Sequence, residues 1–206
     1  MTKFCLILGR MKSPLVLLFI IFIAAAVASC NPGNSNHQPQ PGDSAQVITL
    51  LKEMYRWHDK NQDNGSDFSI IVKDSFQVGL NYDSLNKTIG ALKRTNYFSS
   101  SFLDNYKKLA DIVNHTLVNA NPKYANEINF DFQDADPWTG FQDSDPDYWD
   151  KFRITDYRSS ADSASLKWLI KTNNWSSDPY AVGFAKENGQ WKVSWLEGFD
   201  LKKYAK

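Results

Sequence analysis

The spacing of apolar residues changes once along this chain, close to Pro122. Before Pro122, apolar side chains recur at intervals of three and four residues, which is typical of helices with one buried face. After Pro122, apolar and polar residues alternate over short segments, which is typical of strands. Helices followed by a meander of strands predict an α+β domain in which N-terminal helices pack on one face of an antiparallel sheet.

Three segments carry the helical pattern. The first begins after Asp43 and Ser44, which are good helix-capping residues. The second is a weaker helix former because Gly90 interrupts it. The third ends at Asn121-Pro122, since proline cannot continue a helix.

The alternating pattern predicts four strands. Asn188-Gly189 is a strong hairpin signal, so the last two strands are expected to pair antiparallel. An earlier apolar run at 69–72 is compatible with either a strand or a turn of helix. The expected strands span residues 151–158, 165–172, 180–187 and 190–197.

Residues 1–29 have the organisation of a signal peptide. Lys12 supplies the positive charge, and the thirteen-residue apolar run that follows it is shorter than the roughly 20 residues that cross a bilayer as a helix. Ala28-Ser29-Cys30 resembles the lipobox of bacterial lipoproteins, which implies acylation of Cys30 and a membrane anchor. The alternative is an ordinary secretory signal with an unrelated cysteine. A complete signal begins at Met11, so the sequence leaves open whether translation starts at Met1 or at Met11.

The chain is divided into the signal peptide at 1–29, a flexible tether at 30–43 and a single domain at 44–206. The tether is polar and rich in proline, so it has nothing to bury. Without the three basic residues that precede Cys30, 20 basic residues stand against 23 acidic ones. Nothing in this balance favours nucleic acid, which selects a clustered basic face.

The order of elements and several short motifs resemble small secreted bacterial domains of unknown function with the nuclear transport factor 2-like, cystatin-related cone. The motifs are LLKEMYRWH, YFSSSFLDNY, DADPWTGFQD and the closing NGQWKVSWLEGF. The resemblance implies a helix lying across a curved antiparallel sheet, with a pocket between them. It implies no activity, because relatives include enzymes, ligand-binding modules and structural modules.

Seven aspartates lie between residues 131 and 150. Asp136-Pro137 and Asp145-Pro146 favour turns, and this is the preferred interpretation. A second interpretation is calcium binding by Asp143, Asp145 and Asp147, whose carboxylates would project to one side of an extended segment. A third is a binding loop formed by these three aspartates with Asp136 and Trp138.

His58 is the candidate base if the protein is an enzyme, because histidine most often titrates near neutral pH. Tyr55 and Asp156 could join it in a pocket. The preferred interpretation is that His58 is a hydrogen-bonded core residue and that no residue is catalytic. We expect neither a cofactor nor a resident metal.

Seven tryptophans raise the possibility of carbohydrate binding. Trp138, Trp149 and Trp175 lie in turn-rich stretches, where exposed rings could stack on a sugar and buried rings would fill the ends of the domain. Burial is preferred, since large exposed apolar patches are uncommon.

These features together predict an envelope lipoprotein, anchored to the lipid bilayer through Cys30, that binds a small molecule or an envelope protein without catalysis. Surface-exposed lipoproteins of some bacteria carry acidic residues just after the acylated cysteine. The tether has none before Asp43, so an outer-membrane position facing the periplasm is favoured. The alternatives are a hydrolase or isomerase with His58 as base, and a carbohydrate-binding module that uses exposed tryptophan.

Metabolic labelling with a clickable palmitate analogue tests the anchor. The wild-type protein is expected to be labelled and Cys30→Ala to be unlabelled, because the thiol is the acylated group. Equal labelling of both proteins would exclude Cys30 as the site of acylation.

Overall fold

The computed structural model describes residues 43–61, 67–119, 135–141, 149, 151–173 and 175–204. The expected signal peptide, Cys30 and the tether up to residue 42 lie outside these ranges. The elements, in chain order, are α2 (Asp43–Asn61), β1 (Ile70–Lys73), β2 (Phe76–Leu80), α3 (Tyr82–Thr95), α4 (Ser100–Asn119), β3 (Phe152–Ser159), β4 (Ser163–Ile170), β5 (Tyr180–Glu187), β6 (Gln190–Leu196), η3 (Glu197–Phe199) and α5 (Leu201–Tyr204).

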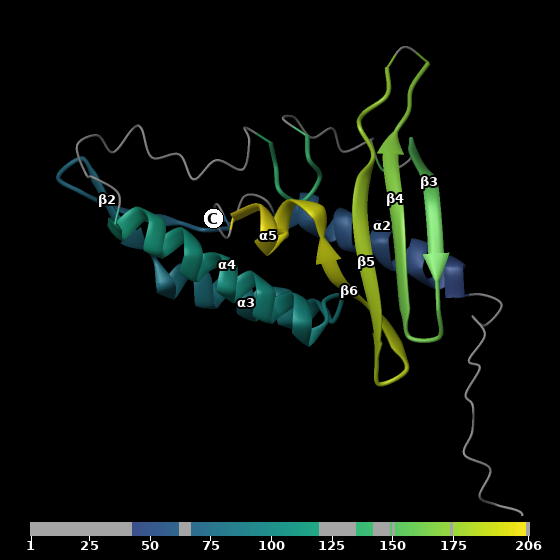
Figure 1. The fold of residues 1–206 in the computed structure, drawn as a ribbon, viewed down its shortest axis with the longest axis horizontal. Coiled ribbons are helices and arrows are strands. Elements are labelled where there is room, and N and C mark those ends of the chain that lie inside the picture. The colour runs from purple at the N-terminus through teal and green to yellow at the C-terminus, as the bar shows by residue number, and fades with distance from the viewer. Residues whose placement is uncertain are drawn as a thin grey trace, which may run out of the picture. The chain divides into compact units, whose positions relative to one another are not determined.

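The last four strands form one antiparallel sheet in the order β3-β4-β5-β6. Figure 1 shows α2 passing across one face of this sheet, and both α2 and α4 contact β6. The α+β class with helices on an antiparallel sheet is therefore confirmed. The strands agree with the expected segments to within about two residues, which is the usual uncertainty of element boundaries.

The turn between β5 and β6 is the one that the sequence predicts. Asn188 and Gly189 have φ angles of 53° and 76°, so both central residues are left-handed. Glu187 faces Gln190 across the turn. Two left-handed central residues match the right-handed twist of the flanking strands, which explains why Asn-Gly is favoured here.

The apolar run at 69–72 becomes β1, which pairs antiparallel with β2. The connecting turn uses Asp74 and Ser75, whose φ angles are 50° and 69°. Because this turn contains no glycine or asparagine, the sequence signal for the hairpin is weak. Leu80 of β2 donates its amide to Asn114 Oδ1 of α4 at 2.9 Å, which fixes the hairpin to that helix.

Aromatic rings fill the space between α2 and the sheet. Tyr55 of α2 stacks on Trp149, with ring centroids 4.3 Å apart and planes inclined by 7°. The rings of Tyr55 and Trp168 of β4 pack edge to face, with centroids 5.0 Å apart. Trp138 contacts Phe102 of α4 and Phe199 of η3. These rings exclude water from the interior and supply much of the buried apolar surface.

Three buried indoles donate their N–H groups to aspartates at the two ends of α2 and just beyond it. Trp191 donates to Asp43 Oδ1 at 3.0 Å, and Trp138 donates to Asp67 Oδ2 at 2.8 Å. Trp149 donates to Asp59 Oδ2. A buried donor without a partner would cost roughly 1–3 kcal/mol, so each pair avoids that penalty.

The Asp43 carboxylate is expected to be the costliest of these groups to remove. It is 4% exposed and also pairs with Lys186 Nζ at 3.1 Å, so it joins the start of α2 to the β5–β6 hairpin. Asp43→Ala leaves an indole and an ammonium group without their partner, and we expect the free energy of unfolding in urea to fall by about 3–5 kcal/mol. The matched control is Asp83→Ala, an exposed aspartate in the first turn of α3, which should cost less than about 1 kcal/mol.

Candidate functional site

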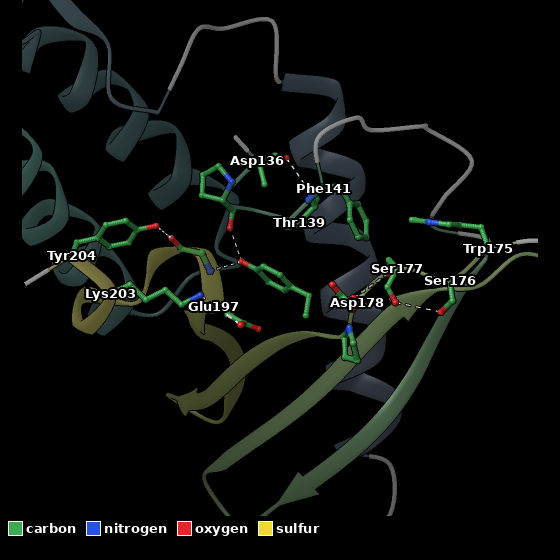
Figure 2. Close-up of a pocket in the computed structure, with 16 residues that line it drawn as sticks. Asp136, Thr139, Phe141, Trp175, Ser176, Ser177, Asp178, Glu197, Lys203 and Tyr204 are labelled. Atoms are coloured by element: carbon green, nitrogen blue, oxygen red, sulfur yellow. Dashed lines mark hydrogen bonds and ion pairs between the residues drawn. The ribbon is translucent and has the colours of Figure 1, made fainter. Parts of the chain in front are cut away.

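A cleft of about 700 Å³ opens between three segments that are distant in sequence. Its walls are residues 135–141, the β4–β5 connection at 175–180, and residues from η3 and α5. Figure 2 shows these segments around the cleft, with Phe141 and Trp175 toward one end and Glu197, Lys203 and Tyr204 toward the other. The volume lies within the range of small-molecule sites.

The first wall, residues 135–141, is a turn built by Asp136. The Asp136 carboxylate accepts the amide of Trp138 at 2.9 Å, and its backbone oxygen accepts the amide of Gly140 at 2.7 Å. Gly140 has a φ of 73°, which a residue without a side chain adopts at no steric cost. Asp136 therefore acts as a turn residue at the edge of the cleft.

Tyr180 joins all three walls. Its hydroxyl donates to the carbonyl oxygen of Pro137 at 2.5 Å and accepts the amide of Gly198 at 2.9 Å. A Cβ atom on Gly198 would lie 2.0 Å from the Pro137 oxygen, so only glycine permits this approach. The floor of the cleft is consequently held by hydrogen bonds on both sides and does not depend on a ligand for its shape.

Three of the four charged side chains that line the cleft are held by hydrogen bonds or an ion pair within the protein. Glu197 accepts the amide of Ala181 at 2.9 Å and pairs with Lys203 Nζ at 3.5 Å. Burial raises the pKa of Asp136, while its hydrogen bonds from Trp138 and Thr139 lower it again. Asp178 is exposed on the same wall as Ser176 and Trp175.

The candidate catalytic residues of the enzyme alternative do not meet at the cleft. Tyr55 is fully buried and its hydroxyl donates to the Trp138 carbonyl at 2.8 Å. The His58 ring lies 4.4 Å from the Trp138 ring, between centroids. Asp156 pairs instead with the exposed guanidinium of Arg158 at 3.3 Å. None of the three candidate residues is among those that line the cleft.

A bulge explains the position of Asp156. The pairing of β3 with β4 shifts between Ile154 and Asp156, so the alternation of inward and outward side chains changes phase there. Sequence alternation cannot reveal such a shift, because it leaves no mark in the pattern of residue types. Burial is the main cause of the raised pKa of the Tyr55 phenol, and the carboxylates that add to it are Asp136 and Asp59.

Burial shifts the pKa values of two titratable groups beside Trp138 in opposite directions. Burial lowers the pKa of His58 to about 4. Burial raises the pKa of Asp67 to about 6, against the opposing effect of its hydrogen bonds from Tyr106 and Trp138. Asp67 has no distinguishing sequence signal, since it follows a turn-rich stretch and reads as one more loop aspartate.

The three tryptophans considered for carbohydrate binding differ in their exposure to solvent. Trp138 is 2% exposed and Trp149 is 4% exposed, so both fill the interior, whereas Trp175 is 49% exposed at the rim of the cleft. Asp143, Asp145 and Asp147 lie outside the described residues. Within the described ranges, no three His, Cys, Asp or Glu side chains are grouped to hold a metal ion, and no helix is long and apolar enough to cross a membrane.

Comparison with known proteins gives little further information. No protein-family model matches the chain, and no curated protein matches it. A chain in the crystal structure of the type VI native effector–immunity complex Tae3–Tai3 from Ralstonia pickettii is 12% identical, with 72% of this chain and 90% of that chain covered and a TM-score of 0.38. A similarity of this size does not indicate a shared function.

The lowered pKa of His58 predicts a pH-dependent stability. Between pH 6.5 and pH 4 the unfolded chain binds a proton at this histidine and the folded chain does not, so acidification favours unfolding. We expect wild type to lose up to about 3 kcal/mol relative to His58→Gln over this interval, as measured by urea denaturation at each pH. A constant difference between the two proteins would show that His58 titrates normally in the folded state.

Proposed function

We propose that this protein is a lipid-anchored envelope protein whose α+β domain binds a small molecule in the cleft without catalysing a reaction. The observation that carries the proposal is the cleft itself, about 700 Å³ in volume, with aromatic and polar side chains on preformed walls. Preformed concave sites with a few polar groups are typical of ligand binding. The same cleft also suits a short segment of another envelope protein, which is the second type of ligand in this proposal.

The distribution of catalytic groups supports binding over catalysis. A general base must come within hydrogen-bond reach of the proton that it removes. His58 lies against the Trp138 ring, and neither His58 nor Tyr55 is among the residues that line the cleft. The alternative, a hydrolase or isomerase with His58 as base, would require a rearrangement around Trp138.

The finer fold assignment and the location belong to the same proposal. A helix across an antiparallel sheet, as α2 lies here, is compatible with the nuclear transport factor 2-like cone. The lipobox-like sequence at Cys30 supports lipid anchoring, and the absence of acidic residues immediately after it supports an outer-membrane position facing the periplasm.

Native mass spectrometry tests whether the cleft binds a molecule. The full-length protein in detergent is incubated with a small-molecule extract of the source cells, washed, and compared with Ser176→Arg, which places a long side chain in the cleft. Wild type is expected to retain an adduct that Ser176→Arg loses. The retained molecule should be recovered with its mass unchanged.

Ser165→Arg is the matched control, since Ser165 is exposed on β4 and does not line the cleft. It should retain the adduct. An adduct bound equally by wild type and Ser176→Arg would contradict cleft binding. A mass change that disappears in His58→Gln would favour the enzyme.

A further inference from the structure

We infer that the protein forms a two-fold symmetric dimer through the β1–β2 hairpin, in which the outer edge of β1 pairs with the same edge of a second copy. None of the hairpin residues lines the cleft, so the inference is independent of the proposed ligand binding. Three observations carry it: apolar side chains gathered around the hairpin, unpaired backbone groups along β1, and the attachment of β2 to α4.

Exposed apolar side chains are concentrated around the hairpin. Among the described residues, seven large hydrophobic side chains are exposed, and all except Trp175 lie on β1, β2, the start of α3 or the end of α4. These six side chains are each between 40% and 62% exposed. They form the hairpin patch, which consists of Ile71, Val72, Phe76, Val78, Tyr82 and Val118.

Strand pairing and side-chain contacts connect the hairpin patch to α4. Ile71 pairs with Gly79, and a Cβ atom on Gly79 would lie 3.6 Å from Val118 Cγ2. The Tyr82 hydroxyl donates to Asp111 Oδ1 at 3.2 Å, about two helical turns before Val118. Figure 1 shows β2 at the end of α4 that is remote from the four-stranded sheet. The patch therefore extends over one end of the domain.

The outer edge of β1 carries unpaired backbone groups. The Ser69 carbonyl accepts the Asn81 amide, so Ser69 is hydrogen-bonded across the hairpin. The next residue, Ile70, faces Leu80, and its N–H and C=O groups consequently point away from β2. Those of Val72, two residues further along β1, point the same way. Within the described ranges, no third strand pairs with this edge.

The outer edge of β2 is attached to α4, which limits the assembly to two copies. Leu80 donates its amide to Asn114 Oδ1 at 2.9 Å, and contacts with α4 extend along β2. Among the described residues, the hairpin thus offers a single free edge, that of β1. Two copies that join this edge to itself about a two-fold axis leave no edge for a third copy. The expected assembly is a closed dimer.

Charged groups at the tip of the hairpin favour a protein partner over a lipid bilayer. Lys73 and Asp74 are both exposed there. Insertion of the tip would carry these charges and the unpaired backbone groups into hydrocarbon, where water cannot satisfy them. A second β1 strand instead supplies hydrogen-bond partners. In an antiparallel pair the two tips lie at opposite ends, so like charges of the two copies stay apart.

The size of the hairpin patch agrees with that of a dimer interface. Six large side chains that are about half exposed present on the order of 500 Å² of apolar surface, comparable to the largest patches on monomeric proteins. A two-fold axis uses the patch once on each copy. With a polar rim, the buried area approaches the roughly 800 Å² per partner of a stable complex.

Sedimentation velocity of the full-length protein in a density-matched detergent measures the association. Wild type is expected to be dimeric at roughly 50 μM, since interfaces of this size bind with micromolar or higher affinity. Val72→Lys should weaken dimerisation about tenfold or more, because it places a charge where the two strands meet. Val118→Lys, which changes α4 and leaves the strands intact, should also weaken it. Ser165→Lys, exposed on β4, is the matched control and should change nothing.

Cysteine cross-linking tests the proposed geometry. Ile71→Cys and Val72→Cys are made separately in the full-length protein and oxidised in membranes of the source cells. Antiparallel pairing about a two-fold axis brings the two copies of at least one position within disulfide reach, which is about 4.4–6.8 Å between Cα atoms. At least one variant should give a covalent dimer. Ser165→Cys should give none beyond any formed by Cys5 or Cys30, which all three variants share.

Three results would overturn the inference. One is a wild-type protein that remains monomeric at about 200 μM, and another is the absence of a cross-link from both hairpin cysteines. The third is quenching by brominated phosphatidylcholine of a bimane on Val72→Cys beyond that on Ser165→Cys, which would place the patch in the bilayer. Far-ultraviolet circular dichroism should show the wild-type spectrum for each lysine variant, because all three positions are exposed.

Discussion

Hydrogen bonds between buried indoles and aspartates hold the helical part of this structure to its sheet and loops. Each aspartate belongs to α2 or follows it, and each tryptophan comes from a later part of the chain: Trp138 and Trp149 precede β3, and Trp191 lies in β6. An indole N–H usually finds a hydrogen-bond partner when its ring is buried. The rings therefore supply apolar surface, and the carboxylates fix where along α2 that surface packs.

Trp138 occupies the centre of this arrangement. Its ring contacts His58, Phe102 and Phe199, its indole binds Asp67, and its carbonyl accepts the Tyr55 hydroxyl. The adjacent Pro137 carbonyl accepts the Tyr180 hydroxyl at the floor of the cleft. One residue therefore faces the core while its neighbour shapes the candidate site, so the packing of the core and the shape of the cleft are set by the same short segment.

The sequence predicts the helices and strands better than it predicts the residues of the candidate site. Spacing of apolar residues gives the helices and the four-stranded sheet, and Asn188-Gly189 gives one hairpin, because these signals are local. The hairpin at Asp74-Ser75 lacks such a signal. The cleft joins residues 135–141, 175–180 and 197–204, and no local pattern of the sequence records that these segments meet. The bulge before Asp156 likewise depends on its partner strand.

The opposite pKa shifts of the buried His58 and Asp67 determine how many protons the protein takes up or releases when it unfolds. When the chain unfolds near pH 5, the histidine takes up a proton, since its pKa rises from about 4 toward its ordinary value. The aspartate releases one, since its pKa falls from about 6. The two exchanges have opposite signs and overlapping ranges. Unfolding at that pH therefore changes the total number of protons bound by this pair very little. For that reason, a small change of pH near 5 alters the free energy of unfolding very little through these two residues together.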